Sequence, residues 1–162
     1  MIEFKKISED RWKEYRDLRL EALQQEPLAF SESYEDTKNM PENAWRSRID
    51  NILFAFDEDK LIGMIGFFRV NEIKCKHVAN IYGVYVKKEY RCKGVGKRLI
   101  EAMISQIQQY QDIIKIQLGV NPVQKTAVKL YEDFGFTVIG RMNQEIYVED
   151  KFYDELLMEK FL

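Results

Sequence analysis

Residues 85–98 read Tyr-Val-Lys-Lys-Glu-Tyr-Arg-Cys-Lys-Gly-Val-Gly-Lys-Arg, and this stretch decides the fold. It leads from a β-rich run (78–88), through a loop containing Gly94 and Gly96, into apolar residues at helical spacing up to about Tyr110. The first N–H groups of a helix are unpaired and carry the positive end of its dipole. Glycines at that point let a phosphate group approach the backbone closely. The stretch therefore predicts a strand, a phosphate-binding loop and a helix, in that order.

Basic charge is concentrated at this loop. Residues 87–98 hold six lysines and arginines against one glutamate, a net charge of +5, whereas the whole chain carries −2. The remaining residues must then carry −7, so the loop suits a polyanionic ligand. The acidic balance of the whole chain argues against nucleic acid as a partner, because proteins that bind the phosphate backbone usually carry a basic excess.

The rest of the chain alternates β-rich and helical patterns. Strands are predicted at 2–7, 52–56, 61–70, 78–88, 113–120, 136–148 and 152–161, and helices at 9–25, 42–49, 94–110 and 123–134. Hairpin-joined strands come first, a strand-helix-strand unit follows, and a hairpin that turns at 149–151 closes the chain. This order favours an α/β (α+β) fold with a mixed sheet flanked by helices.

Two other phosphate-binding loops do not fit the pattern. A P-loop would need serine or threonine in place of Arg98 and glycine in place of Arg91. A dinucleotide-binding fingerprint would need a third glycine where Leu99 stands. The remaining pattern, Arg91-x-x-Gly94-x-Gly96, resembles the R/Q-x-x-G-x-G/A pyrophosphate loop of the GNAT acetyltransferases. A basic, solvated loop before a surface helix is the alternative that this motif alone leaves open.

A second motif lies downstream, in residues 121–136. It resembles the family signature N-x-x-A-x-x-L-Y-x-x-x-G-F, and the matching residues are Ala127, Leu130, Tyr131, Gly135 and Phe136. Gln124 stands where the family often has asparagine, and Asn121 could supply a replacement amide. Weaker likenesses at residues 18–30 and 153–158 extend the resemblance over most of the chain. We therefore identify residues 1–162 as a single GNAT-like domain with a mixed, mostly antiparallel central sheet flanked by helices.

The resemblance implies acetyl-CoA as cosubstrate and a set of residues that bind it. Main-chain groups of Val84, Tyr85 and Val86 would bind the pantetheine arm like an added strand. The pyrophosphate would rest on the loop and helix start, formed by Arg91, Cys92, Lys93, Gly94, Val95, Gly96, Lys97 and Arg98. Asn121, Gln124 and Tyr131 complete the expected coenzyme contacts, and no metal is expected.

Tyr131 is the expected catalytic residue. Aminolysis of a thioester expels a thiolate, and a positioned phenol can protonate it. The alternative is that Tyr131 is an aromatic member of the apolar face of its helix. The sequence does not identify the group that takes the proton of the amine. The candidates are His77, a water chain and three glutamates, Glu32, Glu35 and Glu145.

The implied reaction is N-acetylation of a primary amine by direct attack in a ternary complex. The amine could belong to a small molecule, an amino acid, a polyamine or a peptide N-terminus. A cationic acceptor is favoured by four early acidic residues, Glu26, Glu32, Glu35 and Asp36. The alternative function is a non-catalytic, regulatory module that binds acyl-CoA.

Composition limits the remaining possibilities. Neither a secretory signal nor an apolar run of about 18 residues is present, so we expect a cytoplasmic protein without a membrane partner. Two cysteines are too few for a disulfide framework, and one histidine argues against a histidine-based metal cluster. The two final strands could pair across a homodimer.

Overall fold

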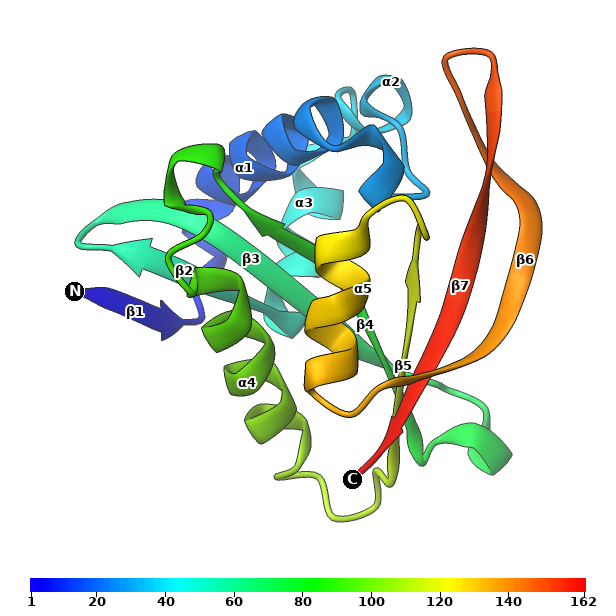
Figure 1. The fold of residues 1–162 in the computed structure, drawn as a ribbon. Helices are drawn as coiled ribbons and strands as arrows, with labels where there is room; N and C mark the ends of the chain where they lie inside the picture. The colour runs from blue at the N-terminus through cyan, green and yellow to red at the C-terminus, as the bar shows by residue number, and fades with distance from the viewer. The chain divides into compact units, whose positions relative to one another are not determined.

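The computed structural model describes all residues 1–162, which form seven β-strands and five α-helices (Figure 1). The strands are β1 (Ile2–Lys5), β2 (Ile52–Asp57), β3 (Lys60–Arg69), β4 (Val78–Val86), β5 (Lys115–Val120), β6 (Thr137–Val148) and β7 (Lys151–Phe161). The helices are α1 (Trp12–Gln25), α2 (Tyr34–Thr37), α3 (Glu42–Arg48), α4 (Val95–Ile107) and α5 (Lys125–Asp133). None of these helices combines the length and the apolar character that crossing a membrane requires.

The strands form a seven-stranded sheet in the order β1-β2-β3-β4-β5-β7-β6. The pairs β1–β2, β2–β3, β5–β7 and β6–β7 are antiparallel, and β4–β5 is parallel. A parallel pair needs a crossover connection, which the segment containing α4 supplies. The predicted fold class, a mixed and mostly antiparallel sheet with flanking helices, is confirmed.

The chain folds into two compact units. The first consists of Met1–Phe67 and Gly83–Ser105, and the second of Phe68–Tyr82 and Gln106–Leu162. Strands β3 and β4 therefore contribute residues to both units. The single domain over 1–162 stays a prediction.

In the first unit, α1 buries one side against α3 and β2. Its period of 3.6 residues brings Tyr15, Leu18 and Ala22 to the core, where each is less than 4% exposed. The ring of Tyr15 meets Trp45 and Phe54 edge-on, with centroids 5.6 and 5.7 Å apart. Burial of such aromatic rings dominates the energetics of a small core, so this cluster holds the helices on the sheet.

In the second unit, β6 and β7 form a long hairpin (Figure 1). Glu149 and Asp150 have φ angles of 50° and 59°, which gives the turn two left-handed central residues and matches the twist of the strands. Farther along β6, a bulge places Gln144 at φ 55°, and its N–H donates to the carboxylate of Asp154 at 2.9 Å. The predicted turn is confirmed, whereas nothing in the periodicity indicated the bulge.

Two features differ from the sequence prediction. Residues 34–37, where no helix was predicted, form α2, whose N-terminus is capped by the side chain of Ser33 accepting from the Asp36 N–H at 3.1 Å. The strand predicted to reach residue 88 ends at Val86, because Lys88–Tyr90 form a 3₁₀ turn. Both differences reflect side-chain capping and turn chemistry that hydrophobic periodicity does not detect.

Candidate active site

The loop between β4 and α4 has the conformation of an anion cradle. Cys92 and Gly94 both lie in the left-handed region, with φ of 58° and 77°. The first internal hydrogen bond of α4 runs from the Arg98 N–H to the Gly94 carbonyl at 3.1 Å, so the N–H groups of 95–97 precede the helix ladder. A Cβ at Gly94 would meet nothing within 4 Å, so φ rather than space requires glycine there.

Arg91 is committed to contacts within the protein. Its N–H donates to the Lys88 carbonyl at 3.2 Å, so the free main-chain donors of the predicted cradle begin at Cys92. Its guanidinium donates to the Val86 carbonyl at 2.9 Å and forms an ion pair with Glu26. The side chain of Arg91 thus anchors the loop to the end of β4 and to the residue after α1.

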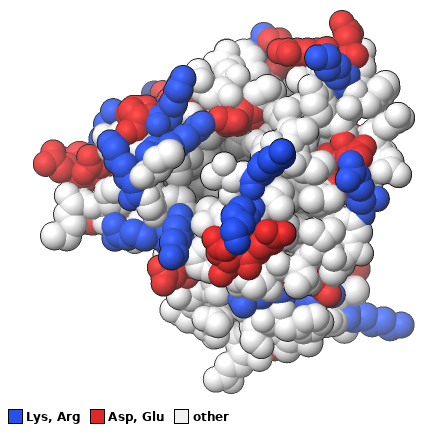
Figure 2. Space-filling model, viewed as in Figure 1, with Lys and Arg blue, Asp and Glu red and all other residues white.

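Part of the basic charge predicted at the loop is neutralised. Lys87 forms an ion pair of 2.5 Å with Glu21 of α1, which also accepts a hydrogen bond of 2.9 Å from the hydroxyl of Tyr85. Burial and this bond to Glu21 raise the pKa of Tyr85. Over the face drawn in Figure 2, Lys and Arg are interspersed with Asp and Glu. The exposed cations that remain at the loop are Lys88, Lys93, Lys97 and Arg98.

β4 departs from regular strand geometry just before the predicted pantetheine-binding residues. Gly83 has φ 65°, and a Cβ there would lie 3.0 Å from Nη1 of Arg19. Val84 and Val86 are half-buried and Tyr85 is buried. The Val86 carbonyl already accepts from the side chain of Arg91.

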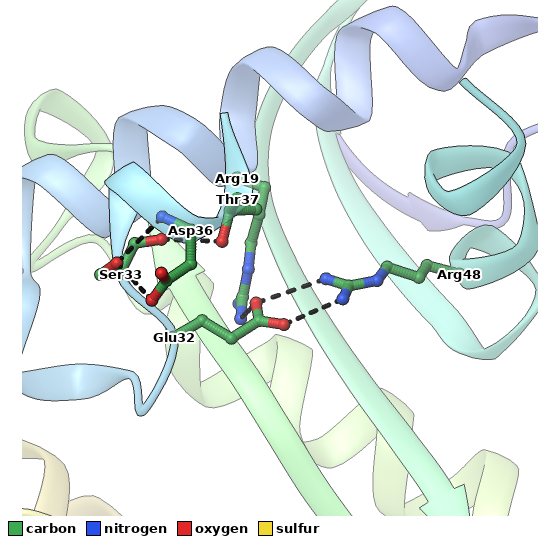
Figure 3. A network of polar contacts seen from close by, with 6 residues as sticks. All are labelled: Arg19, Glu32, Ser33, Asp36, Thr37 and Arg48. Atoms are coloured by element: carbon green, nitrogen blue, oxygen red, sulfur yellow. Dashed lines mark hydrogen bonds and ion pairs between the residues drawn. The ribbon is translucent and has the colours of Figure 1, made fainter. Parts of the chain in front are cut away.

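A polar network beside α1 contains two of the four early acidic residues, Glu32 and Asp36 (Figure 3). The Glu32 carboxylate forms ion pairs with Nη2 of Arg19 at 2.9 Å and with Nη2 of Arg48 at 3.0 Å. Burial acts to raise the pKa of Glu32, but the hydrogen bonds and charges of the two arginines outweigh it and hold the pKa below the usual range. Glu32 is therefore a poor proton acceptor.

The other early acids are also engaged. Glu35 pairs with Lys38 at 2.5 Å, and the Asp36 carboxylate accepts from the hydroxyl of Ser33 at 2.7 Å. With Glu26 on Arg91, all four residues that favoured a cationic acceptor already have partners inside the chain. The sequence argument from these residues to the acceptor is therefore not supported.

In the second unit, a pocket opens where β4 and β5 separate. The parallel ladder joins Val78–Asn80 to Lys115–Gln117, and the next residues along both strands line a pocket of about 230 Å³ instead. Its wall includes Asn80, Ile81, Gln117, Leu118, Gly119 and Glu155. That a glutamate of β7 lines this pocket was not predicted from the sequence.

Asn121 follows β5 directly and is 2% exposed. Its Oδ1 accepts from the N–H of Val123 at 3.1 Å, while its Nδ2 has no hydrogen-bond partner in the protein. A buried donor without a partner costs about 1–3 kcal/mol. Gln124 is half-buried at the start of α5, and its side chain makes no capping bond. The buried amide nitrogen without a partner in this region is thus that of Asn121.

Tyr131 lies on α5 and is 7% exposed. Its ring meets Phe136 edge-on, with the centroids 5.9 Å apart. Burial raises the pKa of Tyr131, so the phenol stays protonated at neutral pH. Both interpretations of this residue fit its position, because a packed ring and a protonated hydroxyl occur together.

The remaining candidate bases lie apart from one another in the fold. His77 precedes β4, and its carbonyl accepts from the N–H groups of Ile114 and Lys115, at the end of the ladder away from the pocket. Glu145 lies in the bulge of β6. Sequence reasoning missed Glu155. The adjacent acids 154–155 in an apolar strand were the available signal, because neighbouring strand residues face opposite sides of the sheet.

Comparison with known proteins identifies the class. The sequence profile described as the Acetyltransferase (GNAT) family matches residues 5–136. That range is most of the chain, and the protein belongs to the GNAT acetyltransferase family. It is an enzyme that uses acetyl-CoA as cosubstrate and transfers the acetyl group to an amine.

Individual relatives are more distant. The spermidine N(1)-acetyltransferase of Vibrio cholerae serotype O1 (strain ATCC 39315 / El Tor Inaba N16961) is 27% identical over 138 residues, covering 82% of this chain and 80% of the relative. A GNAT-family acetyltransferase from Streptococcus pneumoniae has a similar structure, with a TM-score of 0.88, 23% identity and full coverage of both chains. The Salmonella typhimurium protein yncA, solved with its cofactor acetyl-CoA, has a TM-score of 0.85 at 17% identity over 100% of this chain and 94% of that one.

Proposed function

We propose that this enzyme acetylates a primary amine by direct transfer, with Tyr131 as the general acid. The observation that carries the proposal is the buried, protonated phenol on α5. Because burial keeps this phenol protonated at neutral pH, its proton is available to the sulfur as the C–S bond breaks. The thiol of coenzyme A leaves as the amide bond forms, without an acyl-enzyme.

In this proposal the loop holds the coenzyme by its pyrophosphate. The main-chain N–H groups from Cys92 to Lys97 would bind the phosphate oxygens, and the exposed lysines of the loop would add long-range attraction. The unpartnered Nδ2 of Asn121 would donate to a carbonyl of the pantetheine arm. The main chain of Val84 and Tyr85 would provide the strand-like contacts.

The acceptor that we favour is a cationic primary amine such as a polyamine. The support is the relative from Vibrio cholerae, which is named for acetylation of spermidine and aligns with 82% of this chain. Amino acids and peptide N-termini belong in the same test panel. We place the enzyme in the cytoplasm, where its two exposed free cysteines, Cys75 and Cys92, would stay reduced.

The decisive experiment measures acetyl transfer from acetyl-CoA to a panel of amines by product mass, because the exposed cysteines would react with thiol dyes. We expect Tyr131→Phe to lower kcat by about 10²-fold or more, the range of general acid catalysis, with acetyl-CoA affinity within about twofold of wild type. Tyr110→Phe, after α4, is the matched control and should retain full activity.

A different result would favour the alternative function. If the wild-type protein binds acetyl-CoA but acetylates no amine on the panel, the non-catalytic acyl-CoA-binding module becomes the better description. If Tyr131→Phe transfers acetyl groups at the wild-type rate, the enzyme stands but the general acid is another group.

A further inference from the structure

The pocket at the separation of β4 and β5 contains one ionisable side chain, that of Glu155 in β7. The carboxylate lies directly over the main chain of β5. A Cβ built at Gly119 would come within 2.6 Å of Oε1 and 2.7 Å of Cδ of Glu155. No larger residue at position 119 leaves this carboxylate in place, so Gly119 makes the room for it.

Glu155 has no ion-pair partner within the chain. Two other carboxylates of β7 do have one, since Glu159 pairs with Lys115 of β5 (3.0 Å) and Asp154 with Arg141 of β6 (2.5 Å). β4 contributes uncharged groups to the pocket. Burial, followed by the like charge of Glu145 in β6, raises the pKa of Glu155.

A half-buried carboxylate without a cation is unfavourable for the folded protein. The missing positive charge is one that a ligand can supply. The other walls of the pocket include the apolar side chains of Phe68, Ile139 and Leu157, which suit an aliphatic chain. These features match an alkylammonium ion, with its charge on Glu155 and its carbon chain on the apolar wall.

We propose that Glu155 binds the ammonium group of the acceptor in this pocket and removes its proton for attack on the thioester. This inference rests on the proposed function, since it identifies the acceptor site and the missing base of that reaction. The pocket lies on β5, the strand that leads through Asn121 to α5 and Tyr131. Asn80 and Gln117, which also line the pocket, provide amide groups for the remaining ammonium protons.

The proton balance is complete with these groups. The ammonium loses one proton to the Glu155 carboxylate, and the freed lone pair attacks the thioester carbonyl carbon. The C–N bond forms, the C–S bond breaks with its electron pair going to sulfur, and the thiolate takes the phenol proton of Tyr131. The second proton of the attacking nitrogen returns to the Tyr131 oxygen, and Glu155 releases its proton to solvent. One ammonium and one thioester give one amide, one thiol and one proton.

The test compares Glu155→Gln with wild type, using the best amine of the panel. We expect kcat/KM for the amine to fall at least about tenfold, which is about 1.4 kcal/mol, while acetyl-CoA affinity stays within about twofold. Glu159→Gln is the matched control, because it removes the same charge from the same strand at a carboxylate already paired with Lys115. We expect that control to stay within about threefold of wild type.

The pH profile separates a base from a structural residue. Without Glu155, only the neutral amine can react, so kcat/KM of the E155Q variant should rise about tenfold per pH unit up to the pKa of the amine. The wild-type profile should level off once Glu155 is ionised. Gly119→Ala is a second variant, whose new methyl group displaces the carboxylate without changing charge, and it should also lose at least about tenfold in kcat/KM.

The contradicting outcomes are distinct. Suppose that the wild type is active and that E155Q and G119A have the same activity and the same pH profile. This result overturns the role of Glu155 and leaves the proposed function intact. An equal loss in E159Q overturns it too, because the effect would then come from strand charge in general. A wild type that binds acetyl-CoA but acetylates no amine overturns both proposals.

Discussion

Arg19 of α1 donates a 2.9 Å hydrogen bond to the carboxylate of Glu32, which lies thirteen residues later in the chain. Arg19 is 6% exposed, so its charge depends on this carboxylate, and its guanidinium also lies 4.5 Å from the ring centroid of Phe30. Arg48 approaches the same carboxylate from α3 (Figure 3). One carboxylate thus compensates two guanidinium groups beside the Gly83 segment of β4.

Glu32→Gln should destabilise the protein, because it leaves Arg19 and Arg48 facing each other without a negative charge. We expect the free energy of unfolding to fall by about 1–3 kcal/mol, less than for a fully buried pair because Glu32 is partly exposed. Urea denaturation measures it. The control is Glu35→Gln, whose exposed pair with Lys38 should change stability by less than about 0.5 kcal/mol. Equal effects in the two variants would contradict the prediction.

The contribution of Glu32 should also depend on pH. Its pKa in the folded protein is below the usual carboxyl value of 4.5, so the folded state favours the charged form. The resulting stability is present above that value and is lost as the pH falls through the folded pKa. Denaturation curves of wild type and E32Q should therefore converge as the pH drops below about 4.5. A difference that grows in acid would show that another effect dominates.

Gly94→Ala should weaken both the fold and coenzyme binding. A residue with Cβ pays about 1–2 kcal/mol at the φ of 77° found there, although nothing lies within 4 Å of the added atom. Relief of this strain would move the N–H groups of the loop, and we expect acetyl-CoA affinity to fall at least about tenfold in calorimetric titration. Gly140→Ala is the control, since its Cβ would make an ordinary 3.8 Å contact with Leu157. It should change neither quantity by more than experimental scatter.

Lys97→Ala should weaken acetyl-CoA binding in a salt-dependent way. Lys97 is exposed in the first turn of α4 and has no ion pair, so its charge is available to phosphate. We expect a loss of about three- to tenfold at low ionic strength that shrinks towards 0.5 M salt, where the screening length is only a few ångströms. Lys13→Ala on α1 should have no effect at either salt concentration. A loss for Lys97→Ala that salt does not change would point to a packing role.

Glu155→Gln should not destabilise the protein at neutral pH. Burial and the charge of Glu145 raise the pKa of Glu155 in the folded protein above 4.5, so folding favours the protonated form of this carboxyl. As the pH rises through that pKa, Glu155 becomes charged and the folded protein loses stability. We expect E155Q to equal or exceed wild-type stability at pH 7, by up to about 1 kcal/mol, and the advantage to vanish below about pH 4.5. Thermal melts at the two pH values measure it. In contrast, Glu159→Gln breaks a half-buried pair with Lys115 and should be less stable than wild type at pH 7.

Much of the fold could be predicted because its signals are local. Helical spacing in 94–110, the two final β-rich runs and the turn at 149–151 each depend on residues close in sequence, and all appear in the structure within a few residues. The loop between β4 and α4 was predictable for the same reason, since its glycines and the helix start are adjacent. α2 was missed because its stability depends on the cap from Ser33 rather than on an apolar stripe.

The sequence by itself determined the class of the enzyme, the glycine-containing loop before α4 and the motif that carries Tyr131, because each is written in consecutive or helically spaced residues. Only the tertiary structure decided which charges remain free. Lys87 meets Glu21 across 66 residues, and Glu155 lies over Gly119 because strand register brings β7 beside β5. Ion pairing depends on distance in space, which no spacing along the chain encodes, so the unpaired carboxylate at the candidate acceptor site could emerge only from the fold.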